Sequence, residues 1–131
     1  MIVDTNFVLR GLDRTGDHQT RAVAARILSA RAGNPLRVLS ATVLEVAFVL
    51  QSARAGYGWD RATVARAIEA VLDEPAFAVE HVDAIRAAAR TYRDRAIDLH
   101  DCFLHEMAML DGTRVLSFDA DLRRLGTGEA P

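Results

Sequence analysis

Two short apolar runs near opposite ends of the chain each stop at an aspartate. Residues 1–3 lead into Asp4, and residues 114–118 lead into Asp119. Short apolar runs of this kind are typical of buried strands. In an open parallel α/β sheet the carboxyl ends of the strands line the crevice where ligands bind, so acids that are distant in sequence can meet there. The pattern therefore predicts an α/β fold with an acidic site at the strand ends.

The rest of the chain alternates between short strand patterns and helical apolar stripes. We expect strands at residues 1–4, 37–39, 77–79 and 114–118, helices at residues 5–12, 18–31, 41–54, 60–72, 83–94 and 99–110, and a terminal turn at 121–125. Ser40, Asp60 and Asp83 are the expected helix N-caps. Such alternation predicts a mainly parallel sheet between helical layers.

The chain length suits one domain, and the composition suits a globular protein. The 131 residues are half apolar and one quarter charged, with a net charge of −2, which excludes a disordered chain and a basic tail that wraps polyanions. The single cysteine allows no internal disulfide and fits a reducing compartment. Neither an export signal nor a membrane span is present, so we expect a cytoplasmic protein with no membrane partner.

All 16 cationic side chains are arginine, and lysine is absent. P-loop nucleotide binding needs a lysine, which excludes that class. Receiver domains and haloacid-dehalogenase phosphatases also normally use a lysine, and the second class expects an acid at the position of Asn6. Arginine suits phosphate contacts, but a genome rich in G and C also favours arginine codons, and both explanations stay open.

Asp4, Glu45, Asp101 and Asp119 are the candidate site residues. Each of them alone also fits an ordinary role, as a helix cap or a surface residue. Glu45, however, lies in a segment that is apolar nearly all round, and such a helix is expected to be buried. A buried carboxylate requires a partner or a metal ion, because the unpaired charge costs several kcal/mol.

Converging carboxylates repel one another unless a cation neutralises them. Oxygen ligands prefer hard ions, here Mg²⁺ or Mn²⁺. Such a site can activate water and stabilise a phosphoryl transition state. The predicted reaction is therefore phosphodiester hydrolysis without a covalent enzyme intermediate.

Four motifs in this order, over essentially the whole chain, resemble those of PIN-domain ribonucleases, in particular the VapC-like toxins of bacterial toxin–antitoxin pairs. They are Met1-Ile-Val-Asp-Thr-Asn6, Ser40-Ala-Thr-Val-Leu-Glu45, Asp98-Leu-His-Asp101 and Val115-Leu-Ser-Phe-Asp-Ala-Asp-Leu122. The resemblance implies a three-layer α/β/α sandwich as a nuclease domain over residues 1–125. As a chain terminus, the tail at 126–131 is expected to be frayed.

The resemblance also implies one or two Mg²⁺ or Mn²⁺ ions held by the four acids. Asp4 and Asp101 would bind metal directly, Glu45 would complete or orient the hydrated ion, and Asp119 would bind a second ion or a water on the metal. Auxiliary positions are Asp98, Thr5, Asn6 and Ser117, with helix capping as the alternative for Asp98. Asp121 is expected to serve the terminal turn.

His105 departs from the family pattern, which usually has a small apolar residue there. It either contacts a substrate phosphate or is a packed histidine with a satisfied hydrogen bond. His100, Cys102 and His105 lack the paired spacing of a structural zinc site.

RNA is the expected substrate, and the arginines that are candidates to flank the site are Arg10, Arg14, Arg93 and Arg95. The resemblance further implies a homodimer and a cognate antitoxin protein. The alternatives are a PIN nuclease that processes RNA or acts on DNA outside a toxin pair, and a catalytically silent binding module.

Overall fold

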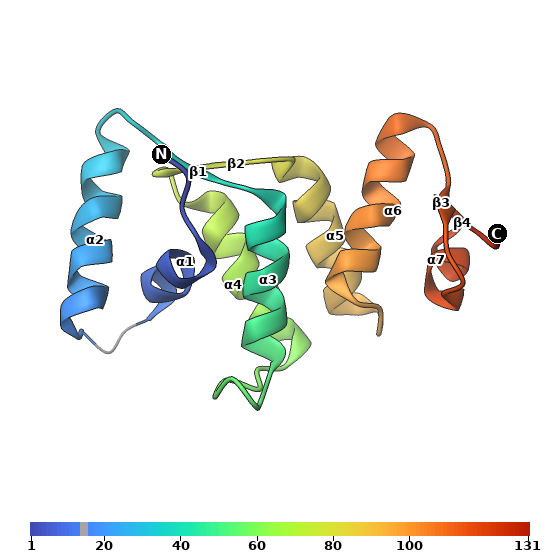
Figure 1. Ribbon diagram of the computed structural model, residues 1–131, viewed down its shortest axis with the longest axis horizontal. Coiled ribbons are helices and arrows are strands. Elements are labelled where there is room, and N and C mark those ends of the chain that lie inside the picture. Colours follow the sequence, from blue (N-terminus) through green and yellow to red (C-terminus); the bar gives the residue numbers. More distant parts are fainter. Residues whose placement is uncertain (14–15) are drawn as a thin grey trace. The chain divides into compact units, whose positions relative to one another are not determined.

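The computed structural model describes residues 1–13 and 16–131 and divides the chain into two compact units, Met1–Glu80 and His81–Pro131 (Figure 1). Each unit combines helices with a pair of short parallel strands. The predicted α/β class with short parallel strands is therefore confirmed, and the elements are consistent with the α/β/α architecture. Within the described ranges, no helix is both long enough and apolar enough to cross a membrane.

The described residues of the first unit form α1 (Thr5–Leu12), α2 (His18–Arg31), β1 (Leu36–Val38), α3 (Ser40–Gln51), α4 (Arg61–Asp73) and β2 (Phe77–Val79). Strand β1 pairs in parallel with β2, with Val38 opposite Val79. Helices α1, α3 and α4 pack together, and Val46, Leu50 and Ile68 are fully buried in this core. Burial of such side chains stabilises the unit by roughly 1.5–3 kcal/mol each.

The second unit contains α5 (Val82–Asp94), α6 (Leu99–Asp111), β3 (Val115–Leu116), α7 (Ala120–Leu125) and β4 (Gly128–Glu129). Helices α5 and α6 pack side by side and bury Ile85, Tyr92 and Cys102. Gly112 ends α6 in the left-handed conformation, with φ of 64°, which glycine adopts without steric cost. Strand β3 then pairs in parallel with β4.

Three local predictions were wrong. Residues 1–4 form a single bridge from Ile2 to Arg37 in place of a strand. Ser40 is the first residue of α3, where its hydroxyl donates to the Glu80 carbonyl oxygen at 3.1 Å in place of capping the helix. Asp83 lies inside the first turn of α5, because His81, in the left-handed conformation, precedes that helix. In contrast, Asp60 caps α4 as predicted, accepting from the Thr63 amide at 2.8 Å.

The C-terminal segment also differs from the frayed tail expected for residues 126–131. Thr127 is 5% exposed, and Gly128 pairs with Val115 of β3. A Cβ atom at Gly128 would lie 2.5 Å from backbone atoms of Leu122 and Arg123. The segment therefore packs closely against α7 only because residue 128 is glycine.

Candidate metal site

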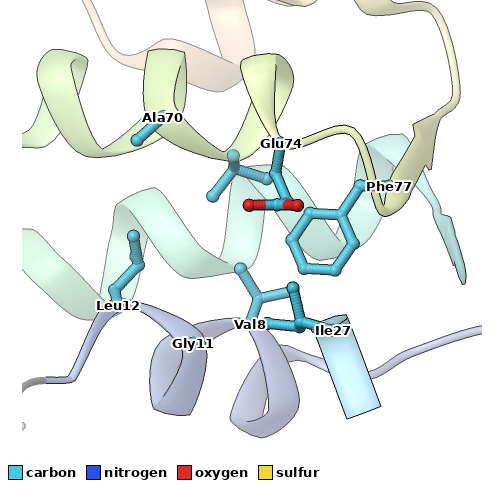
Figure 2. Close-up of a pocket in the computed structure, with 8 residues that line it drawn as sticks. Val8, Gly11, Leu12, Ile27, Ala70, Glu74 and Phe77 are labelled. Carbon is cyan, nitrogen blue, oxygen red and sulfur yellow. The ribbon is translucent and has the colours of Figure 1, made fainter. Parts of the chain in front are cut away.

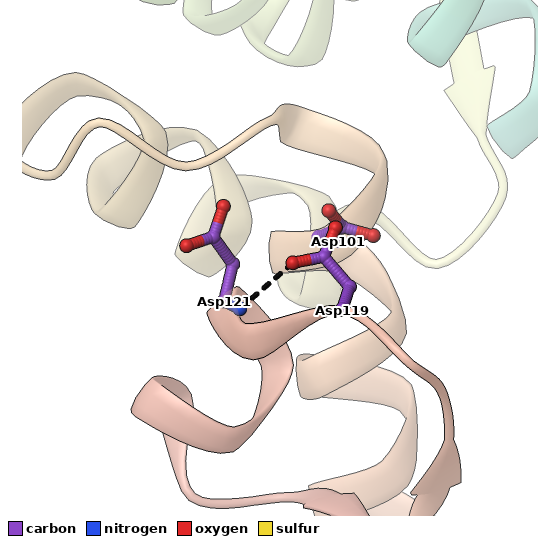
Figure 3. A group of neighbouring side chains, drawn as sticks. All are labelled: Asp101, Asp119 and Asp121. Atoms are coloured by element: carbon purple, nitrogen blue, oxygen red, sulfur yellow. Dashed lines mark hydrogen bonds between the residues drawn. The ribbon is translucent and has the colours of Figure 1, made fainter. Parts of the chain in front are cut away.

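Three aspartates of the second unit converge into one group, which we call the Asp101 cluster: Asp101, Asp119 and Asp121 (Figure 3). One carboxylate oxygen from each lies within 4.8 Å of the other two. Asp101 is in the first turn of α6, Asp119 is the N-cap of α7, and Asp121 is in the first turn of α7. The start of α6 and the start of α7 therefore supply all three acids.

Short hydrogen bonds hold the turn that carries Asp119. The Asp119 amide donates to Ser117 Oγ at 2.9 Å, and Asp119 Oδ1 accepts from the Asp121 amide at 2.8 Å (Figure 3). The second of these bonds is an ordinary helix cap. It engages one carboxylate oxygen, so capping and cation binding are compatible at Asp119. Ser117, predicted to support a carboxylate, here anchors the Asp119 backbone.

The cluster is electrostatically strained at Asp101. Partial burial, followed by the charges of Asp119, Asp98 and Asp121, raises the pKa of the Asp101 carboxyl, and only His100 opposes this effect. The neighbouring negative charges therefore disfavour ionisation of the Asp101 carboxyl. A divalent cation would reverse this penalty, and three carboxylates form a donor set that suits Mg²⁺ or Mn²⁺.

Asp121 belongs to the cluster, although the sequence assigned it only to the terminal turn. The sequence signal that could have identified Asp121 is its position two residues after Asp119, at the start of a helix. Arg124 Nη1 donates to Asp121 Oδ1 at 2.7 Å, which compensates part of the local negative charge. Asp98 occupies the N-cap position of α6 without a capping hydrogen bond from its side chain, so the capping alternative lacks its main support.

The other two predicted acids lie in the first unit. Asp4 caps α1 by accepting from the Phe7 amide at 2.8 Å, and Thr5 Oγ1 donates to Glu45 Oε2 at 2.6 Å. The expectation that Glu45 is buried was wrong, because its side chain is exposed. Asn6 is also exposed, on α1. The Thr5–Glu45 hydrogen bond therefore holds Glu45 of α3 at the start of α1, where Asp4 is the N-cap.

The candidate arginines are engaged in surface contacts where the structure describes them. Arg10 donates to Asp17 Oδ2 at 2.6 Å, and Arg93 donates to both carboxylate oxygens of Asp94. Arg95 is exposed at the C-terminal end of α5. Arg14 lies outside the described residues. Exposed ion pairs of this kind stabilise the fold only slightly. Each arginine can therefore exchange its carboxylate partner for a substrate phosphate at a small cost in free energy.

His105 forms a defined hydrogen bond within the second unit. Its Nδ1 atom lies 2.8 Å from Thr127 Oγ1, and Thr127 is buried beside β4. Of the two interpretations left open by the sequence, the packed histidine with a satisfied partner is the one that the structure supports. The bond ties α6, four residues after Asp101, to the C-terminal segment.

The first unit also contains a cavity of about 170 Å³ between α1, α2 and α4 (Figure 2). The side chains that line it include Val8, Ile27 and Phe77 and one charged group, Glu74. Hydrogen bonds from Arg31, both 2.7 Å long, hold the pKa of the Glu74 carboxyl below its ordinary value. The charge at the cavity is therefore already compensated, and no predicted site residue lines the cavity among the described residues.

The comparison with protein families gives one match. The family described as PIN domain matches residues 1–128, which include all four acids predicted from the sequence. Among curated proteins, no sequence matches this chain closely enough to count as a relative.

Proposed function

The chain belongs to the PIN-domain family, and on this basis we propose that it is a Mg²⁺- or Mn²⁺-dependent endoribonuclease. PIN domains are generally nucleases that use divalent metals, and the observation that carries the proposal is the Asp101 cluster, with three carboxylate oxygens within 4.8 Å of one another. A bound divalent cation would offset the negative charges that raise the pKa of Asp101.

The proposed roles follow the chemistry of each side chain. A bound divalent ion would supply Lewis acidity toward a phosphate oxygen and toward water. Asp101 and Asp119 would hold it, with Asp121 available as a further oxygen ligand. Asp4 is proposed as a direct ligand, and Glu45, fixed by Thr5, as the group that orients water around the ion. For Asp4 and Glu45 the support is the sequence motif and the family.

We further propose that the enzyme is the toxin of a type II toxin–antitoxin pair. The support is the order of the four motifs, the chain length and the resemblance to VapC-like toxins. A cognate antitoxin, a homodimer and a cytoplasmic location belong to the same proposal. The cytoplasm also suits a chain whose single cysteine, Cys102, is buried and forms no disulfide.

The test is the metal dependence and the product ends of RNA cleavage. Hydrolysis by water breaks the P–O bond without using the ribose 2′-hydroxyl, so we expect cleavage in Mg²⁺ or Mn²⁺, none in EDTA, and products without 2′,3′-cyclic phosphate. End-labelled oligoribonucleotides resolved by mass spectrometry measure both properties. Cleavage that persists in EDTA, or cyclic phosphate ends, would contradict the proposal.

A further inference from the structure

Phe118 is an apolar side chain in an unusual place. It is 85% exposed, more than any other large apolar residue in the described part of the chain. It lies between Ser117 and Asp119, the two residues whose hydrogen bond anchors the Asp101 cluster. The ring of Phe118 therefore presents an uncovered aromatic face beside the acids of the cluster.

Two arginines of α7 flank the same turn. Arg123 Nη1 contacts the carbonyl oxygen of Phe118 at 3.5 Å, and Arg124 pairs with Asp121 of the cluster. Both side chains are exposed. Residues 117–124 therefore carry an exposed aromatic ring, two cations and two acids of the cluster on one strand-to-helix turn.

We propose that Phe118 stacks on an unpaired base of the nucleic acid substrate, next to the phosphate to be cleaved, while Arg123 and Arg124 contact neighbouring phosphates. This inference rests on the proposed nuclease function. An aromatic ring offers a stacking surface to any unpaired base, whereas a base within a duplex is already stacked on its neighbours. The Arg124 side chain is 57% exposed, so it can reach a phosphate that approaches the cluster.

A protein partner is the alternative occupant of this surface. Leu116, the last residue of β3 and two residues before Phe118, is 71% exposed and would extend an apolar contact. We favour the nucleotide because the ring adjoins cations and a proposed hydrolytic site, and charged residues are depleted at the cores of protein interfaces. The experiment below separates the two.

Binding of a mixed-sequence single-stranded oligoribonucleotide is measured by fluorescence anisotropy, with Ca²⁺ in place of Mg²⁺ to suppress hydrolysis. Phe118→Ala is expected to weaken binding about tenfold, within the range known for loss of one base–aromatic stack. Phe118→Leu, which keeps an apolar side chain without the aromatic face, should weaken it similarly, and Phe118→Tyr should not. Affinity for the same sequence in a duplex should stay unchanged for all three variants.

Arginine variants test the second half of the proposal. Arg124→Gln should weaken binding of the single strand and lower its dependence on salt, because a phosphate contact is lost. Arg90→Gln, at an exposed position of α5, is the control and should leave both unchanged. In Mg²⁺, Phe118→Ala should raise KM with little change in kcat.

Three results would overturn the inference. The first is equal single-strand affinity in wild type and Phe118→Ala, and the second is Phe118→Leu binding the single strand as tightly as Phe118→Tyr. The third is a change of oligomeric state in Phe118→Ala with RNA binding intact. Thermal melting verifies that each variant is folded. If wild type binds through Phe118 but cleaves nothing in Mg²⁺, the nuclease proposal fails and the stacking role stands. If the protein cleaves RNA and KM does not change when Phe118 is replaced, the stacking role fails and the nuclease proposal stands.

Discussion

Replacement of Asp101 by asparagine is expected to lower metal-dependent RNA cleavage about a hundredfold or more, since a metal ligand contributes several kcal/mol to stabilisation of the transition state. Asparagine keeps the size of the side chain and removes the charge. Initial rates at saturating Mg²⁺ measure the effect, and growth after induced expression measures it in cells. Wild type should arrest growth if it is a toxin, and the variant should not.

The same substitution should make the metal-free protein more stable at neutral pH. Since the pKa of Asp101 is raised in the folded state, the ionised carboxyl destabilises the fold. This penalty is absent well below the ordinary aspartate pKa of 3.8, and it develops as the pH rises from there through the folded-state pKa.

Asp111→Asn, at the exposed end of α6, is the matched control and should change neither cleavage nor stability appreciably. Full cleavage by Asp101→Asn would remove this residue from the mechanism.

Replacement of Asp4 by asparagine separates helix capping from the proposed metal binding. Asparagine is as good an N-cap as aspartate, so the hydrogen bond from the Phe7 amide and the stability of α1 should persist. If Asp4 also binds metal, cleavage should fall about a hundredfold, by the same electrostatic argument as for Asp101. Steady-state cleavage and chemical unfolding of the same preparations give both numbers.

Asp60→Asn is the matched control in the same unit. Asp60 caps α4 through the same geometry, accepting from the Thr63 amide at 2.8 Å, and is not a predicted site residue. Cleavage by this variant should equal that of wild type. Equal cleavage by Asp4→Asn as well would assign Asp4 to helix capping only.

Local sequence patterns predicted most helices, because their boundaries follow from caps and turns. Asp60 before α4 and Gly112 after α6 mark real ends, for physical reasons visible in the sequence. The tail could not be predicted in the same way. Its order depends on the tight approach of Gly128 to α7, a contact between segments that no local pattern encodes.

The sequence marked Asp101 and Asp119 as candidate acids, and it did not show the surroundings of Glu45 or the place of Asp121. Glu45 was expected to be buried because its segment is apolar nearly all round, yet it shares an exposed face of α3 with Ala41 and Phe48. A uniformly apolar helix carries no periodic signal that tells which face meets solvent. Asp121 was assigned to a turn because sequence spacing alone does not reveal that α6 and α7 bring its carboxylate to Asp101.

The most direct test is a calorimetric titration of metal-free protein with Mn²⁺. It compares wild type with an Asp101→Asn, Asp119→Asn double variant. We expect wild type to bind Mn²⁺, and to bind it more tightly as the pH rises from acidic to neutral, because protons compete for the Asp101 carboxylate, whose pKa is raised. The double variant should lose this binding. Equal Mn²⁺ affinity in the two proteins would contradict the claim that these carboxylates form the metal site.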